Sequence, residues 1–86
     1  MKDLEKQYKA LANRRRLSIL KYLSSRTNAS VGDIAKEIKL QVKSTSKHLR
    51  VLAGVDFVES EQQSLHVFYF LPKEKSSILK QTLSNL

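Results

Sequence analysis

The alternation of apolar and polar positions is clearest between Val31 and Leu52, where it predicts two short helices. In the first helix the apolar side chains recur at steps of three and four residues: Val31, Ile34, Ala35 and Ile38. Ser30 followed by Asp33 resembles a capping box at its start. A polar break at about Lys39–Gln41 separates it from a second helix that begins near Val42. A short helix, a tight break and a second helix are typical of a helix-turn-helix.

The second predicted helix has two chemically different sides. Its apolar side carries Thr45, Leu49, Leu52 and Ala53, and the opposite side carries Lys43, Ser46, Lys47 and Arg50. Residues three or four apart are neighbours on a helix surface, so the second set forms one basic stripe. A stripe of this kind is typical of a helix that reads DNA, although a basic stripe is also how an ordinary solvated helix face looks.

Two helices are predicted before this pair. The first, which Asp3 can cap, carries a narrow apolar seam of Leu4, Tyr8 and Leu11. Asn13 marks a break, after which a broader stripe should be central to the core: Leu17, Ile19, Leu20 and Leu23. We expect the stem of Arg16 to pack and its head to pair internally, while Arg14 and Arg15 point outward as phosphate candidates or as a solvated pair. Residues 24–28 form a polar loop.

After the helix pair, Gly54 is expected to end the helix, as glycine commonly does. Residues 57–60 and 65–71 are rich in β-branched and aromatic residues, and the polar residues 61–64 separate them, which predicts a two-stranded hairpin. Pro72 then stops the strand and suits the first turn of a last helix over residues 73–86. The predicted fold is mainly α with a small β-hairpin, a winged helix-turn-helix in the order α-α-α-α-β-β-α.

Length and charge restrict the class of protein. Eighty-six residues make one domain, residues 1–86, with a modest core that association would help to stabilise. The net charge of +8 suits a polyanionic partner such as nucleic acid, and thirteen of the sixteen lysines and arginines lie within residues 1–55. The chain has no cysteine, no membrane-spanning apolar run and no apolar leader, so we expect a cytoplasmic protein.

Three segments resemble the ArsR/SmtB family of small winged-helix repressors. The first is L-A-N-R-R-R-L-S-I-L at residues 11–20, similar to the opening of that family. The second is S-T-S-K-H-L-R-V-L at residues 44–52, similar to its recognition helix, in which S-K-H-L-x-x-L is fairly specific. The third is V-F-Y-F-L at residues 67–71, similar to the strand that closes its wing. The resemblance spans roughly residues 8–71.

The resemblance implies a homodimer that binds double-stranded operator DNA and represses transcription. The first and last helices would form the dimer interface, through Leu4, Tyr8, Leu11, Leu79, Leu83 and Leu86. The DNA contacts that it implies, taken together with the basic stripe and the polar wing tip, come from Lys43, Ser44, Ser46, Lys47, His48 and Arg50, with Gln62 and Gln63 in the wing. For His48 a packed, hydrogen-bonded role is the competing interpretation.

The sequence departs from that family at two places. Family metal sensors often carry cysteines in the helix before the turn, where this chain has Ser30 and Gly32, or His and carboxylates in the last helix, where it has only Glu74. Transition-metal sites need three or four soft or imidazole ligands, so we expect no metal site and no cofactor. The wing tip carries Glu61 and glutamines instead of arginine or lysine, so any DNA contact there rests on the glutamines and Ser64.

An enzyme is excluded first, because no nucleophile has a base and an orienting partner, and two glycines cannot supply a phosphate-binding loop. The competing function is a winged-helix module for protein–protein interaction, or for non-specific nucleic-acid binding within a larger assembly. Sequence dependence separates the two, because a repressor protects a pseudo-palindrome whereas a non-specific binder shows only a steep salt dependence.

Overall fold

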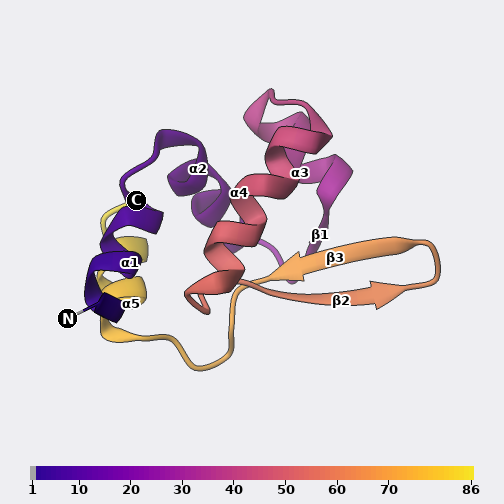
Figure 1. Cartoon of the computed structure of the whole chain (residues 1–86). Coiled ribbons are helices and arrows are strands. Elements are labelled where there is room, and N and C mark those ends of the chain that lie inside the picture. The colour runs from indigo at the N-terminus through magenta and orange to yellow at the C-terminus, as the bar shows by residue number, and fades with distance from the viewer. Residues whose placement is uncertain (1) are drawn as a thin grey trace.

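The computed structural model describes residues 2–86, and it confirms the winged helix-turn-helix. The elements in chain order are α1 (Lys2–Leu11), α2 (Arg14–Ser24), β1 (Ala29–Ser30), α3 (Val31–Ile38), α4 (Val42–Gly54), β2 (Glu59–Gln63), β3 (His66–Phe70) and α5 (Ser77–Ser84). Figure 1 shows α1, α5 and both chain ends at one end of the molecule, with the β2–β3 hairpin extending from the other. The helix-turn-helix, α3 and α4, lies between them.

Local caps explain where the helices begin and turn. The Asn13 side chain accepts hydrogen bonds from the N–H groups of Arg15 and Arg16 at 2.9 and 3.1 Å, so the predicted break there is correct. Ser30 Oγ accepts from Asp33 N at 3.1 Å, which supplies the hydroxyl half of the expected capping box. Lys39 is the C-cap of α3 and adopts a left-handed conformation with φ of 55°, which ends the helix and starts the three-residue turn before α4.

The core lies where α2, α3 and α4 meet, and it includes Ala29 of β1. The buried residues from these helices are Ile19, Leu20, Leu23, Ile34, Ala35, Ile38, Leu49 and Leu52, joined by Ala10, Leu11, Ala29, Phe57, Val58 and Leu79. The predicted stripes are therefore correct, except that Ala53 is exposed and not part of the apolar side of α4. Among the described residues, no helix is long and apolar enough to cross a membrane.

The sheet has one strand more than the sequence predicted. β1 pairs antiparallel with β3, Ala29 opposite Tyr69, so the strand order is β1-β3-β2. Two residues are too short to show the period-two alternation from which a strand is predicted. The strand ties the segment before α3 to the base of the hairpin, and Ala29 is buried there.

The hairpin begins later in the chain and its turn is tighter than predicted, since β2 starts at Glu59 and Phe57 and Val58 precede it. Gln63 lies opposite His66, so the connection is the two-residue turn Ser64–Leu65, and residues 61–63 belong to β2 instead of the tip. Ser64 carries the positive φ of 59° that two-residue hairpin turns require. The polar composition of residues 61–63 suggested a loop, but these side chains are solvent-exposed on a strand that leaves the body of the protein.

The last helix begins four residues later than predicted. Residues 71–76 form an irregular segment in which Pro72 is buried, and α5 begins at Ser77. Ser76 is its N-cap, since its hydroxyl accepts a hydrogen bond from Leu79 N at 3.2 Å. The proline therefore ends the strand without starting the helix.

Gly54 is the last residue of α4, but it does not use the conformational freedom of glycine. No described glycine has a positive φ, and the left-handed residue after the helix is Asp56, with φ of 60°. A Cβ added at Gly54 meets nothing within 4 Å. We expect Gly54→Ala to raise the free energy of unfolding by about 0.4–1 kcal/mol, because alanine restricts the unfolded chain more than glycine does. Urea denaturation measures this, and a loss of stability would contradict it.

Candidate nucleic-acid interface

The orientation of α4 is fixed by the three residues that it buries. Thr45, Leu49 and Leu52 are fully buried, and the Thr45 hydroxyl donates to the Gln41 carbonyl oxygen at 2.9 Å. That bond satisfies the only buried polar side chain found in the core of the described residues. Because three successive turns of the helix are anchored in this way, the opposite side of α4 faces solvent.

The solvent side of α4 carries the basic residues that the sequence predicted. Lys43, Lys47 and Arg50 are exposed, while Ser44 and Ser46 are half-buried. We call Lys43, Ser46, Lys47 and Arg50 the outer face of α4. The helix has thirteen residues, none of them acidic, so no carboxylate within it neutralises this face. At 1.5 Å per residue the helix is about 20 Å long, and its outer face presents a positive ridge on a rigid support.

His48 lies on the side of α4 that turns toward α2. Its side chain is half-buried, and its pKa is lowered from 6.5 by burial first and then by the positive charges of Arg16 and Arg15. His48 is therefore neutral at pH 7 and adds no charge to the outer face. The half-burial of His48 agrees with a packed role, and its contact with DNA stays a prediction.

The shift of His48 predicts how this residue affects stability with pH. Below about 6.5 the unfolded chain takes up a proton at His48 more readily than the folded chain does, so its contribution destabilises the fold as the pH falls. Above that range the imidazole is neutral in both states and contributes nothing. An NMR titration should give His48 a pKa below 6.5, and Arg15→Gln should raise it. An unshifted His48, or no response to Arg15→Gln, would contradict the assigned causes.

Two of the three arginines at the start of α2, Arg15 and Arg16, bond to the backbone of neighbouring helices, while Arg14 is exposed as expected. Arg15 Nη1 donates to the carbonyl oxygens of Ile38 and, at 3.4 Å, Lys39, which are free carbonyls at the end of α3. Arg16 Nη2 donates to the Lys9 carbonyl oxygen at 3.3 Å, so one nitrogen of its head is paired internally as predicted, while its Nε has no hydrogen-bond partner among the described residues. A cation at a helix C-terminus is favourable, and Arg15 therefore fixes α2 against the turn of the helix-turn-helix. The expectation that Arg15 points freely outward was therefore wrong, although its side chain remains exposed.

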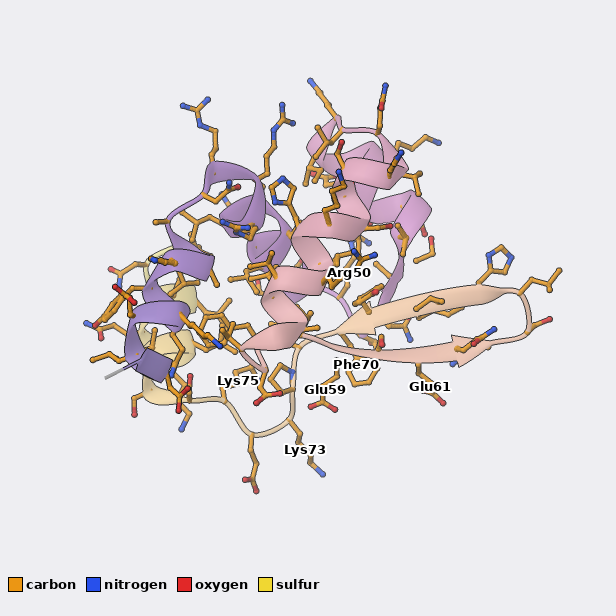
Figure 2. All side chains as sticks on the ribbon, in the orientation of Figure 1. Arg50, Glu59, Glu61, Phe70, Lys73 and Lys75 are labelled. Carbon is orange, nitrogen blue, oxygen red and sulfur yellow. The ribbon has the colours of Figure 1, made fainter. Side chains whose placement is uncertain are left out.

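Strand alternation separates the acidic and amide side chains of the wing. Glu59 and Glu61 lie opposite Phe70 and Phe68 on one face of the hairpin, and Gln62 lies opposite Val67 on the other. Figure 2 shows both carboxylates projecting from the side of the hairpin that faces away from Arg50. Gln63, one residue further on, shares the face of the glutamates. Of the two predicted wing contacts, only Gln62 therefore lies apart from the acidic side chains.

The wing tip also exposes a residue that sequence reasoning did not select. Leu65, in the Ser64–Leu65 turn, is 92% exposed, the largest exposure among the exposed large hydrophobic side chains that the structure describes. The sequence offered no signal for it, because a leucine beside a strand is expected to be part of the strand and half-buried. The tighter turn places it at the end of the hairpin instead.

The six residues assigned to a dimer interface divide into two groups. Leu4, Tyr8 and Leu86 are 44%, 58% and 40% exposed, and Leu83 is half-buried. Leu11 and Leu79 are buried within the protomer itself, so their assignment to an interface is corrected. An apolar seam in the sequence cannot distinguish burial within the chain from burial against a partner. The remaining exposed apolar residues come from α1 and from the end of the chain.

Metal-ligating side chains do not cluster in the part of the chain that the structure describes. Among residues 2–86, no group of three or more His, Cys, Asp or Glu side chains is placed to hold a metal ion. The two histidines lie on α4 and β3 and have different surroundings, since His48 packs toward α2 and His66 lies on the wing, 6.3 Å from the Phe68 ring. The feature that stands out is the rigid, uncompensated positive ridge on α4.

A family model, a sequence relative and solved structures of known proteins all resemble this chain. The sequence model described as "Bacterial regulatory protein, arsR family" matches residues 13–60, more than half of the chain. The HTH-type transcriptional regulator YgaV of Escherichia coli K12 is 27% identical over 78 residues, which cover 91% of this chain and 79% of YgaV. The structures of relatives point the same way.

Two solved structures illustrate the likeness. Reduced HlyU from Vibrio cholerae superposes with a TM-score of 0.82 at 31% identity, covering 98% of this chain and 84% of HlyU. Mb0332 from Mycobacterium bovis, described as a homodimeric winged helix-turn-helix DNA-binding domain, superposes with a TM-score of 0.85 at 25% identity. That match covers 98% of this chain and 75% of the Mb0332 fragment.

Proposed function

The chain belongs to the arsR family of bacterial regulatory proteins and is a DNA-binding transcriptional regulator, not an enzyme; from that premise we propose that it represses transcription as a sequence-specific homodimer. In this proposal the outer face of α4 enters the major groove of operator DNA. The single observation that carries it is the orientation of α4, whose buried side anchors the helix while its basic side stays free. A regulator of this kind acts in the cytoplasm, where the chromosome is.

Each α4 residue proposed to contact DNA has a role suited to its chemistry. The major groove of B-DNA is about 12 Å wide and admits one helix. Lys43, Lys47 and Arg50 reach phosphates or guanine edges, and an arginine can bind guanine through two hydrogen bonds. Ser44 and Ser46 are short enough to let the helix backbone approach the bases. His48 stands at the edge of the contact as a neutral group.

The wing contributes less than the helix in this proposal. Gln62 donates or accepts hydrogen bonds at a groove edge without bringing a charge, and Gln63 shares its face with Glu59 and Glu61, where phosphate is repelled. We therefore assign the wing a supporting contact through Gln62. The positive charge that drives binding lies on the helical part of the chain.

Dimerisation sets the spacing of the two contacts. The Mb0332 relative is described as homodimeric, and here Leu4, Tyr8, Leu83 and Leu86 supply apolar surface at the end of the molecule opposite the wing. A two-fold axis at that end would direct the two wings outward along the DNA. The two α4 helices would then occupy half-sites about one helical turn, roughly 10 bp, apart.

Selection of bound sequences from random double-stranded DNA tests this function. We expect a pseudo-palindrome with half-sites about 10 bp apart, which a footprint of the purified protein should protect. A repressor should then reduce transcription from a promoter that contains the selected sequence. Recovery of no sequence motif, with binding that depends only on salt, would support the competing non-specific module instead.

We also propose that this regulator carries no transition-metal sensor. The chain has no cysteine and two histidines on separate elements, so three soft or imidazole ligands do not come together within one protomer. Zinc, cadmium or arsenite at micromolar concentration should leave the affinity for operator DNA unchanged. Fluorescence anisotropy with a labelled operator measures this, and release of DNA by any of the three would show that a metal site exists.

A further inference from the structure

A groove of about 300 Å³ lies between α1 and the second half of α4, separate from the outer tips of the lysines on α4. Four cationic residues line it: Lys6 and Lys9 from α1, Arg16 from α2 and Arg50 from α4. Its remaining lining is small or apolar and includes Ala10, Val51 and Val55. The groove therefore combines concentrated positive charge with a short apolar surface.

The charges in this groove are not balanced by the protein. No aspartate or glutamate among residues 2–86 lines it, so four positive charges repel one another across a concave surface. Arg16 supplies a second, independent observation, because its Nε atom is buried and has no hydrogen-bond partner among the described residues. A buried, unpaired donor is unfavourable, so this guanidinium keeps hydrogen-bonding capacity that the protein does not use. The uncompensated positive charge of the groove points to a bound anion.

The apolar part of the groove restricts what kind of anion fits. Ala10 is buried and forms part of the floor, Val51 is 41% exposed, and Val55 is half-buried. A bare inorganic ion would leave this apolar surface uncovered, whereas an organic anion with an apolar part would cover it. The volume is at the lower end of the range for small-molecule sites, which suits a small ligand.

The groove lies apart from the proposed dimer interface. Leu4 and Tyr8, which we assign to that interface, project from a different side of α1 than Lys6 and Lys9, because a helix has 3.6 residues per turn.

We propose that the groove binds a small aliphatic carboxylate, and that the bound carboxylate pairs with Arg16 and Arg50. The aliphatic part would cover Val51, Val55 and Ala10, and Lys6 and Lys9 would hold the carboxylate by charge. Carboxylate and guanidinium can form two parallel hydrogen bonds, which suits the two arginines in the lining of the groove.

The shared residue Arg50 makes this site regulatory, a consequence that rests on the proposed DNA-binding function. Arg50 belongs both to the groove and to the outer face of α4. A carboxylate that holds Arg50 withdraws a cation from the DNA contact, so ligand and DNA weaken each other's binding by the same factor. The chain would thus release its operator in response to an organic acid.

The first experiment uses octanoate as the probe, with 1-octanol as its uncharged control, and no DNA. Titration into ¹⁵N-labelled protein should shift the amide signals of Ala10, Val51, Gly54 and Val55, and leave those of the wing unchanged. Lys6→Gln/Lys9→Gln should weaken binding about tenfold, since two partly exposed charge pairs are lost. Val51→Glu, which places a carboxylate in the groove, should abolish it. Lys73→Gln/Lys75→Gln removes the same charge elsewhere and should bind octanoate like the wild type.

The titration without DNA tests the proposed carboxylate site independently of the proposed DNA-binding function. Absence of octanoate binding, or equal weakening by the groove variant and the control variant, would overturn the site. In a second experiment, octanoate should lower the affinity for the selected DNA at concentrations near its own Kd, and 1-octanol should not. Binding of octanoate that left DNA affinity unchanged would contradict the role of Arg50. If the protein selected no DNA sequence at all, the proposed function would fail while the titration without DNA still decided the groove.

Discussion

Replacing both Lys47 and Arg50 by alanine should weaken binding to the selected operator at least thirtyfold. Each contact to phosphate or to a base edge contributes about 1–3 kcal/mol, and both side chains belong to the outer face of α4. The free energy of unfolding should change by less than about 0.5 kcal/mol, because both side chains are exposed and the buried side of the helix is untouched. Anisotropy titrations and urea denaturation measure the two quantities.

A matched variant separates recognition from total charge. Lys73→Ala/Lys75→Ala also removes two positive charges, but from the irregular segment before α5, which lies away from Arg50 in Figure 2. This variant should lose only the weak, long-range attraction to DNA. Its loss of DNA affinity should become smaller at higher salt, because salt screens that attraction. In contrast, the variant of α4 should also show a shallower salt dependence if its residues neutralise phosphates. Equal losses for the two variants would contradict the assignment of α4.

Replacing Leu4 and Tyr8 by glutamate should convert the protein from a dimer into a folded monomer. We expect wild-type protein at micromolar concentration to sediment with twice the 9.9 kDa mass of the chain. Leu4 and Tyr8 are 44% and 58% exposed, so the fold itself does not depend on them. Two carboxylates buried without partners in an apolar interface cost several kcal/mol, which should raise the dimer dissociation constant at least a hundredfold.

Loss of the dimer should also lower the affinity for DNA. A dimer joins two half-sites, and the second contact then forms at a high effective concentration, an advantage of roughly 10²–10⁴. Lys9→Glu changes the charge by the same two units on another side of α1, and it should remain dimeric. A wild-type protein that sediments as a monomer, or a Leu4→Glu/Tyr8→Glu variant that stays dimeric, would place the interface elsewhere.

Long periodic segments could be predicted from the sequence because their burial is set by spacing. The stripe from Ile19 to Leu23, the stripe from Ile34 to Ile38 and the two sides of α4 all appear in the structure. The break at Asn13 was also correct, since an asparagine before a helix has a specific hydrogen-bonding role there. For the same reason the spacing of lysine and arginine along residues 43–50 is enough to propose the basic side of α4 as a DNA contact.

Features that depend on partners distant in the sequence could not be predicted. β1 exists because Ala29 meets Tyr69 in β3, forty residues later in the chain, and two residues alone carry no strand signal. Arg15 binds carbonyl groups at the end of α3, so its outward position on α2 did not make it free. Leu79 was assigned to a partner subunit, but the protomer buries it in its own core. The spacing of apolar residues shows which side of a helix is buried, but it does not show whether the same chain or a partner subunit covers that side.

The position of α4 on DNA is tested most directly by NMR mapping of ¹⁵N-labelled protein bound to its selected sequence. We predict that the largest shifts and the strongest intermolecular contacts come from residues 43–50, with a smaller set near Gln62. The buried residues Leu49 and Leu52 would then contact no base. Contacts concentrated on α1 and α5, with residues 43–50 unchanged, would contradict the placement of α4 in the major groove.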